Sequence, residues 1–415
     1  MNSYPTVPPV CENILAHTDA DLAYVQREIL STINHKIHEE WCLGRHVMLN
    51  WCDAPDGIEV LSVPYFLAPS ILSKNYLINT GSETRLTSGM DLFRGGRYQK
   101  REALTQLALA MDIKPVSISL PYNLLEQGVD TKLVDEIIKR YSISCVENSA
   151  VALFDIVGFS LYNAFEQVTL LNSLAYSINS AHNKMVENGL SVEFARSTTG
   201  DGFYIWNRDN SIQGNINLYH LMHIVLADNA IARTHSHGDT APILKTAFHI
   251  GQYYEYYQAE SLQPTQYNYI VGDVTVELAR MVERAMPGQI LVGKFSSKLP
   301  RENDNAELMM DVDTVRFIEL LQNTLASVKG LVISGQEIDA INCYLTGIKH
   351  SNRFDVSRYE VKDKHNLSRK VYNAKVNIYR ENQPPIYLGL QDHAIKKFGL
   401  NRLTDESSEP LHNAI

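Results

Sequence analysis

The sequence contains no apolar run long enough to cross a bilayer. No stretch approaches the roughly 20 uninterrupted apolar residues of a membrane-spanning helix. The opening segment, residues 1–10, has neither the basic part nor the apolar core of a signal peptide. We therefore expect no membrane insertion and predict a cytoplasmic location.

Cysteine and positive charge are also scarce. The five cysteines are odd in number and include no C-x-x-C pair, which disfavours both a disulfide framework and a structural zinc site. The formal net charge of -10 disfavours a nucleic-acid partner, because a phosphate backbone attracts basic surfaces. The sequence also lacks a Walker-type glycine loop, so any bound phosphates must be held by other groups.

The length of 415 residues predicts more than one domain. Residues 1–146 show helical periodicity near 18–40, 101–112 and 129–141 but no recognisable motif, and we interpret them as a regulatory or dimerisation module, α/β or mostly helical. Strand and helix patterns alternate from residue 147, which indicates an α/β domain over 147–390. Residues 391–415 are expected to form a tail.

Two acidic turns are the most informative feature of this second part. FDIVGFS places Asp155 at the end of an apolar strand, and TTGDGF places Asp201 between two strands that read as a hairpin. Each carboxylate alone is typical of a helix start or a turn. Together, separated by one helix, they match the hard oxygen ligands that Mg²⁺ or Mn²⁺ prefers.

The segment between the two turns has the spacing of an amphipathic helix. Apolar residues recur at steps of three and four and are predicted to share the buried face: Leu161, Phe165, Val168, Leu171, Leu174, Ala175 and Ile178. A buried face of this kind makes the segment a crossover helix between two strands of one sheet.

Four motifs in order give the chain a resemblance to a known family. FDIVGFS, STTGDGF, AFHIG and VELARMVERAMPGQILV follow one another as they do in class III nucleotidyl cyclases, the family of adenylate and guanylate cyclase catalytic domains. The resemblance covers residues from about 147 to 380 and does not extend before 147. It implies a ferredoxin-like mixed sheet flanked by helices, and a homodimer in which two copies complete each active site.

The resemblance also assigns roles to individual residues. Asp155 and Asp201 match the metal-ligand positions, with the backbone carbonyl of Ile156 completing a site for two Mg²⁺ or Mn²⁺ ions. Arg280 matches the arginine that offsets charge on the α-phosphate, although an exposed arginine on an amphipathic helix is the alternative. Lys364 matches the lysine that binds the terminal phosphates, with a solvated turn as its alternative.

Other positions depart from the family pattern. Ser197 stands where adenylate cyclases place the lysine that reads adenine, and Tyr269 stands at the position of its partner. Val276 replaces the asparagine that binds the ribose, and Thr275 is the neighbour that could substitute for it. Loss of one such contact predicts turnover lower by roughly 10²-fold.

These residues leave three functional hypotheses open. The first is a cyclase that converts a nucleoside triphosphate, ATP by family default, into a 3′,5′-cyclic nucleotide and pyrophosphate for intracellular signalling. The second is a degenerate cyclase-like module that dimerises without turnover. The third, a pyrimidine nucleotide cyclase of antiphage defence, rests on the volume of Tyr269, which would narrow a base pocket.

Overall fold

The computed structural model describes residues 23–79, 84–236, 240–259, 266–300, 309–333, 335–349, 354–362, 367–395 and 401–403. The chain divides into two compact units. The first contains Met1–Val146 and Tyr253–Val271, and the second contains Glu147–Gln252 and Gly272–Ile415. The division falls within two long strands, β6 (Ile143–Ile156) and β9 (Leu244–Ala259), and each unit is described by itself below.

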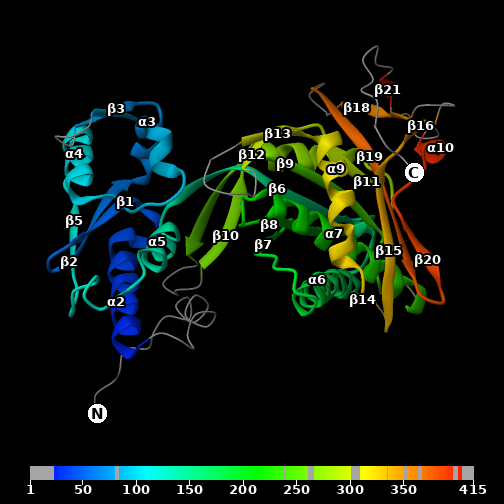
Figure 1. Ribbon diagram of the computed structural model, residues 1–415, viewed down its shortest axis with the longest axis horizontal. Coiled ribbons are helices and arrows are strands. Elements are labelled where there is room, and N and C mark those ends of the chain that lie inside the picture. Colours follow the sequence, from blue (N-terminus) through cyan, green and yellow to red (C-terminus); the bar gives the residue numbers. More distant parts are fainter. Residues whose placement is uncertain are drawn as a thin grey trace. The chain divides into compact units, whose positions relative to one another are not determined.

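The first unit is built on a three-stranded antiparallel sheet in the order β1-β2-β5 (Figure 1). Its elements are α2 (Tyr24–Trp41), β1 (His46–Ala54), β2 (Gly57–Pro64), α3 (Ala68–Leu72), β3 (Asn75–Asn79), β4 (Thr84–Ser88), α4 (Arg101–Met111), β5 (Val116–Ser119), α5 (Thr131–Lys139) and β10 (Gln266–Val271). Of the two alternatives predicted for residues 1–146, the structure shows an α/β arrangement.

A buried polar network fixes the centre of this unit. Arg97 is fully buried, and its guanidinium donates to the carbonyls of Leu92, Phe93 and Ile143. The Asp135 carboxylate accepts from the backbone of Arg97 and from the Trp51 indole at 2.8 Å. Burial lowers the pKa of Arg97 to about 10, against the opposing effect of Asp135, and the arginine remains charged at neutral pH.

The second unit alternates helices and strands around one large mixed sheet. Its elements are α6 (Ala164–Glu187), β7 (Phe194–Thr198), β8 (Gly202–Asn207), α7 (Ile212–His235), α8 (Asp273–Arg284), β11 (Ile290–Gly293), β12 (Ser296–Pro300), β13 (Met309–Asp313), α9 (Thr314–Thr324), β14 (Val332–Ile333), β15 (Gln336–Leu345), β16 (Gly347–Lys349), β17 (Phe354–Val356), β18 (Arg358–Lys362), β19 (Ser368–Arg380), β20 (Gln383–Leu388), α10 (Asp392–Ile395) and β21 (Asn401–Leu403).

The sheet order places the predicted hairpin at one edge. The strands run β14-β15-β19-β11-β9-β6-β8-β7, with β18 and β20 also paired to β19. β11 and β9 are parallel, whereas β6, β8 and β7 pair antiparallel, so the sheet is mixed. The predicted mixed sheet flanked by helices is confirmed.

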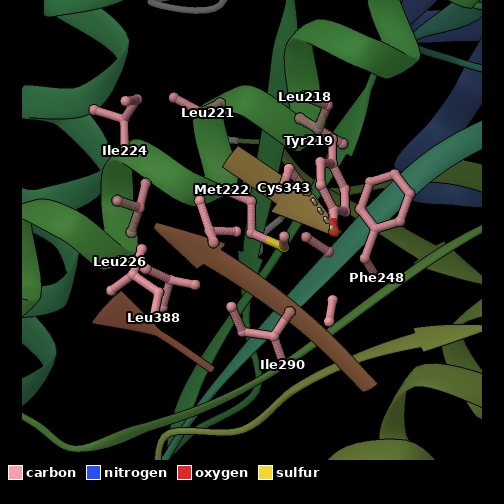
Figure 2. Close-up of a cluster of buried hydrophobic side chains, with 14 of the residues drawn as sticks. Leu218, Tyr219, Leu221, Met222, Ile224, Leu226, Phe248, Ile290, Cys343 and Leu388 are labelled. Atoms are coloured by element: carbon pink, nitrogen blue, oxygen red, sulfur yellow. Dashed lines mark hydrogen bonds between the residues drawn. The ribbon is translucent and has the colours of Figure 1, made fainter. Parts of the chain in front are cut away.

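One face of this sheet carries the main core, under helices α6, α7 and α9 (Figure 1). α7 is apolar around most of its circumference, a pattern typical of a helix enclosed by protein. Figure 2 shows Tyr219 of α7 beside Phe248 of β9 and Cys343 of β15, with the tyrosine hydroxyl next to the cysteine sulfur. α7 therefore forms the centre of the unit.

Helix α8 covers the opposite face of the sheet. Successive strand residues point to opposite faces, so Phe248 enters the main core and its neighbour His249 faces α8. Gly251 lies below α8, where an added Cβ would come within 3.1 Å of Val274. This face is called here the α8 face. It also carries the side chain of Asp155, because Phe154 points into the main core and the residues on either side of it, Leu153 and Asp155, point the other way.

The predicted buried face of α6 is partly wrong. Leu161, Phe165 and Val168 are 89%, 81% and 64% exposed. The helix instead buries a row that begins later: Leu170, Leu174, Ser177, Ile178, Ala181 and Met185. Leu161, Phe165 and Val168 lie outside this buried row, so helical periodicity identified the helix but not which of its residues reach the core.

In the part of the chain that the structure describes, none of the helices combines the length and apolar character needed to cross a membrane.

Candidate active site

The two acidic turns meet at one end of the β6-β8 pair. Asp155 is paired with Gly202 across the two strands, and Asp201 immediately precedes that glycine. The Ile156 amide donates to the Asp201 carbonyl at 2.9 Å, which ties the turns together. A side chain at Gly202 is excluded, because its Cβ would lie 1.9 Å from the Phe154 carbonyl oxygen.

The side chains of Asp155 and Asp201 are electrostatically coupled. Burial, together with the nearby carboxyl of Asp201, raises the pKa of Asp155 to about 6. Lys245 of β9 acts in the opposite direction and is therefore close enough to stabilise the ionised form. The Thr199 hydroxyl also donates to Asp201 at 3.1 Å.

The donor set suits a divalent cation with few protein ligands. Within the described ranges, no group of three or more His, Cys, Asp or Glu residues could hold a metal ion. Mg²⁺ needs only one or two carboxylates when substrate phosphates supply other ligands. Two half-buried carboxyls that repel one another fit such an ion, because a cation between them removes the repulsion.

Arg280 lies on α8 with 24% of its side chain exposed. It forms an ion pair with Glu283 at 3.2 Å, one turn further along the helix. The pairing is between neighbours on a partly exposed helix face and contributes little stability.

The start of α8 is joined to the acidic turns through Tyr204. The Tyr204 hydroxyl donates to the carbonyl of Thr275 at 3.0 Å. Burial raises the pKa of Tyr204 to about 12, and the charge of Asp201 adds to this effect, which places the phenol near that carboxylate. Tyr204 was not predicted, because a tyrosine inside an apolar strand carries no sequence signal of such a bridge.

Thr275 and Val276 differ in what they present to the surface. Thr275 is buried, and its hydroxyl donates to the carbonyl of Gly272 at 2.8 Å within the first turn of α8. Val276 is 47% exposed and offers no hydrogen-bonding group. The hydroxyl of Thr275 is thus engaged by its own helix.

Of the remaining predicted residues, Ser197 and Tyr269 lie in different units and Lys364 is not described. Ser197 is on β7, directly opposite Tyr204, and is half-buried. Tyr269 is on β10 in the first unit, where its ring stacks on that of Tyr256 with centroids 5.8 Å apart. Lys364 falls outside the described residues.

Two titratable residues on the α8 face, Arg369 and His249, were not identified from the sequence. Arg369 of β19 forms an ion pair with Glu277 of α8, and only 14% of the arginine side chain is exposed. Burial lowers the pKa of the neighbouring His249 to about 4, and the charge of Arg369 contributes. The alternation of polar residues in β19 was the available signal, but it does not identify a partner on a helix about 90 residues earlier.

Comparisons with known proteins place the chain beside cyclases of solved structure. No protein-family model matches the chain, and no curated protein matches it in sequence. The guanylate cyclase domain of RhGC from Catenaria anguillulae in complex with GTP is similar at 11% identity, over 57% of this chain and 98% of that one, with a TM-score of 0.32.

Two further structures give similar values. The adenylyl cyclase CyaB from P. aeruginosa matches at 11% identity, over 56% of this chain and 95% of that one, with a TM-score of 0.30. The guanylyl cyclase Cya2 matches at 9% identity, over 56% and 92%, with a TM-score of 0.29. At these values the similarity carries no argument about activity, which must come from the residues themselves.

Proposed function

We propose that the second unit is a nucleotidyl cyclase, which converts a nucleoside triphosphate, ATP by family default, into a 3′,5′-cyclic nucleotide and pyrophosphate. The observation that carries the proposal is the meeting of Asp155 and Asp201, which are 46 positions apart in sequence yet lie close enough for the charge of Asp201 to raise the pKa of Asp155. The order of the four cyclase-like motifs supports it. A fold kept only for assembly has no need of two converging carboxylates.

Asp155 and Asp201 would hold Mg²⁺ or Mn²⁺, with the backbone carbonyl of Ile156 as a further ligand. Such ions, when bound, lower the pKa of the ribose 3′-hydroxyl and offset phosphate charge. The 3′-oxygen then attacks the α-phosphorus in line, and the bond to the bridging oxygen of pyrophosphate breaks. No nucleophile from the protein is required.

The chain's own residues would position and neutralise the phosphates. Arg280 would exchange Glu283 for the α-phosphate and stabilise the charge that grows there. Lys245 would keep Asp155 ionised as a ligand. Lys364 remains our candidate for the terminal phosphates. The resemblance implies that two chains complete each site, and we propose a homodimer with residues 1–146 as its regulatory module.

The experiment is to incubate the purified full chain with ATP, GTP, CTP and UTP in Mn²⁺ and to quantify cyclic nucleotide and pyrophosphate. We expect one or more triphosphates to be cyclised, with product lost in Asp155→Ala. Asp311→Ala is the matched control, because Asp311 is an exposed carboxylate on β13 in the same unit. Preference for UTP or CTP would support the pyrimidine hypothesis based on Tyr269.

A second candidate function is a degenerate module that binds nucleotide without turnover. The observation that favours it is at the start of α8, where Val276 is exposed and the Thr275 hydroxyl is engaged by Gly272. Neither side chain is then available to orient a ribose. Absence of product from all four triphosphates, with triphosphate binding retained, would support this candidate over the enzyme.

A further inference from the structure

The part of the α8 face beyond the helix carries a largely buried lysine and a buried amide oxygen for which the described residues supply no ion-pair or hydrogen-bond partner. Lys375 and Asn377 lie two residues apart on β19 and alternate with the core residues Ala374, Val376 and Ile378, which point to the other face. Both side chains therefore point to the same side of the sheet, roughly 7 Å apart along the strand. This site is distinct from the acidic turns on β6 and β8.

Lys375 is an unusual lysine because the residue is only 4% exposed. Among the described residues, no carboxylate pairs with it and no hydrogen bond to its ammonium is found; its contact is with the Tyr387 ring, 5.7 Å from Nζ. Burial lowers the pKa of Lys375. The stem of Lys375 is therefore enclosed by protein while its ammonium keeps access to solvent, where it can meet an anion.

Asn377 has a hydrogen-bond acceptor to which no described residue donates. Its Oδ1 atom is buried and accepts no hydrogen bond within the described part of the chain. A buried acceptor left unsatisfied is destabilising, which favours a ligand that supplies the missing donor. A ligand for this site must therefore offer an acceptor or negative charge to Lys375 and a donor to Asn377.

Two tyrosines flank this pair on the neighbouring strands. Tyr344 of β15 is directly opposite Lys375, and Tyr387 of β20 is directly opposite Asn377. Directly opposed residues share a face, so both rings project on the same side as the pair. Tyr387 is 63% exposed, and Asn342, opposite Asn377 on β15, is also exposed, so this part of the sheet is open to solvent.

We infer that this tyrosine-flanked site binds a nucleotide, with a phosphate on the Lys375 ammonium, a base N–H donating to Asn377 Oδ1, and the base ring against Tyr387. A nucleotide combines an anion, a donor edge and a planar ring in one small molecule. Exposed aromatic side chains on a sheet are a common platform for stacking bases. β19 lies between the strands of Tyr344 and Tyr387, which are therefore about 10 Å apart. This spacing suits the ring of one nucleotide base between the two tyrosines.

The chain's charge argues that the ligand is a single nucleotide. A polynucleotide would need a basic surface along its backbone, whereas this chain has a net charge of -10 and the site contributes one lysine. Free 5′-monophosphates and the 3′,5′-cyclic products of the proposed reaction share the required chemistry. The experiment below separates these two sources.

The test is isothermal titration of the full chain with AMP, GMP, CMP and UMP, and separately with the four 3′,5′-cyclic nucleotides. We expect binding in at least one series, weakened at least tenfold by Lys375→Met and by Tyr387→Ala, and weakened only a few-fold by Lys375→Arg. Lys349→Met, which removes an exposed lysine on β16, should bind as the wild type. Asp155→Asn should also leave this binding unchanged.

Three results would overturn the inference. They are failure of all eight nucleotides to bind, wild-type affinity in both Lys375→Met and Tyr387→Ala, or loss of binding in Asp155→Asn, which would place the ligand at the acidic turns. Tyr387→Ala guards against misfolding as an explanation, because the exposed ring contributes little to the core. Failure of the proposed cyclase reaction leaves the test intact, since no tested nucleotide is a triphosphate.

Discussion

Replacing Asp155 with asparagine should stabilise the protein in the absence of metal while abolishing its proposed activity. The folded state holds this carboxyl half-buried and close to Asp201, which raises its pKa from 3.8 to about 6. The folded protein therefore retains the proton more tightly than the unfolded chain does. The stability linked to that proton is present below pH 3.8 and is lost as the pH rises through about 6.

The magnitude follows from the difference between the two pKa values. A shift of about two units corresponds to an upper limit of about 3 kcal/mol, and partial solvent screening reduces it. Asparagine has nearly the same shape as the protonated carboxyl and cannot ionise. At pH 8 the variant should therefore melt several degrees higher, since about 1 kcal/mol shifts Tm by roughly 2–4 °C in a unit of this size.

The assay is thermal unfolding of the wild type and of Asp155→Asn at pH 8 and pH 4, with and without Mn²⁺. We expect the gain in Tm at pH 8 to vanish at pH 4, where the wild-type carboxyl is protonated. Added Mn²⁺ should raise the Tm of the wild type more than that of the variant, because a ligand stabilises the state it binds. A lower Tm for the variant at pH 8 would refute the proposed repulsion between Asp155 and Asp201.

Three further changes test other parts of the structure. Burial lowers the pKa of His220 to about 4, so the stability it contributes above pH 6.5 should decline as the pH falls toward 4, by up to about 3 kcal/mol. Because His223, His249 and Asp155 also change the stability over this range, the contribution of His220 is measured as the difference between the wild type and His220→Gln in urea unfolding at pH 7.5 and 4.5. Gly202→Ala should destabilise the fold by about 1–3 kcal/mol or more, because the alanine Cβ would overlap the Phe154 carbonyl. A free energy of unfolding in urea equal to that of the wild type would contradict this. Tyr204→Phe, which removes the hydrogen bond to Thr275, should lower kcat by about fivefold with little effect on KM, and unchanged steady-state kinetics would exclude a positioning role.

The sequence predicted the elements of the second unit better than it predicted their partners. The apolar run before Asp155, the hairpin around Asp201 and the helix before Pro287 each carry a local signal, and the structure contains β6, the β7-β8 pair and α8 at those places. Local periodicity could not show where α6 leaves the core, so Phe165 was assigned to the wrong face.

The contacts that complete the site depend on distant pairings. Lys245 reaches Asp155 only because β9 lies beside β6 in the sheet, and Arg369 meets Glu277 only because α8 packs on the face of the sheet to which Arg369 points. Nothing near either residue in the sequence specifies those neighbours. The burial of Lys375 is a stronger case, because the sequence pattern of a strand predicts an exposed lysine there.

The most direct test of the central claim is whether one cation needs both carboxylates. Mn²⁺ binding to the full chain can be followed by the EPR signal of the free ion, in the presence of 3′-deoxy-ATP, which lacks the attacking hydroxyl. We predict that Asp155→Asn and Asp201→Asn each abolish the same binding and that the double variant loses no more than either single one. Retention of wild-type Mn²⁺ affinity in either single variant, or additive losses in the double variant, would contradict a shared site.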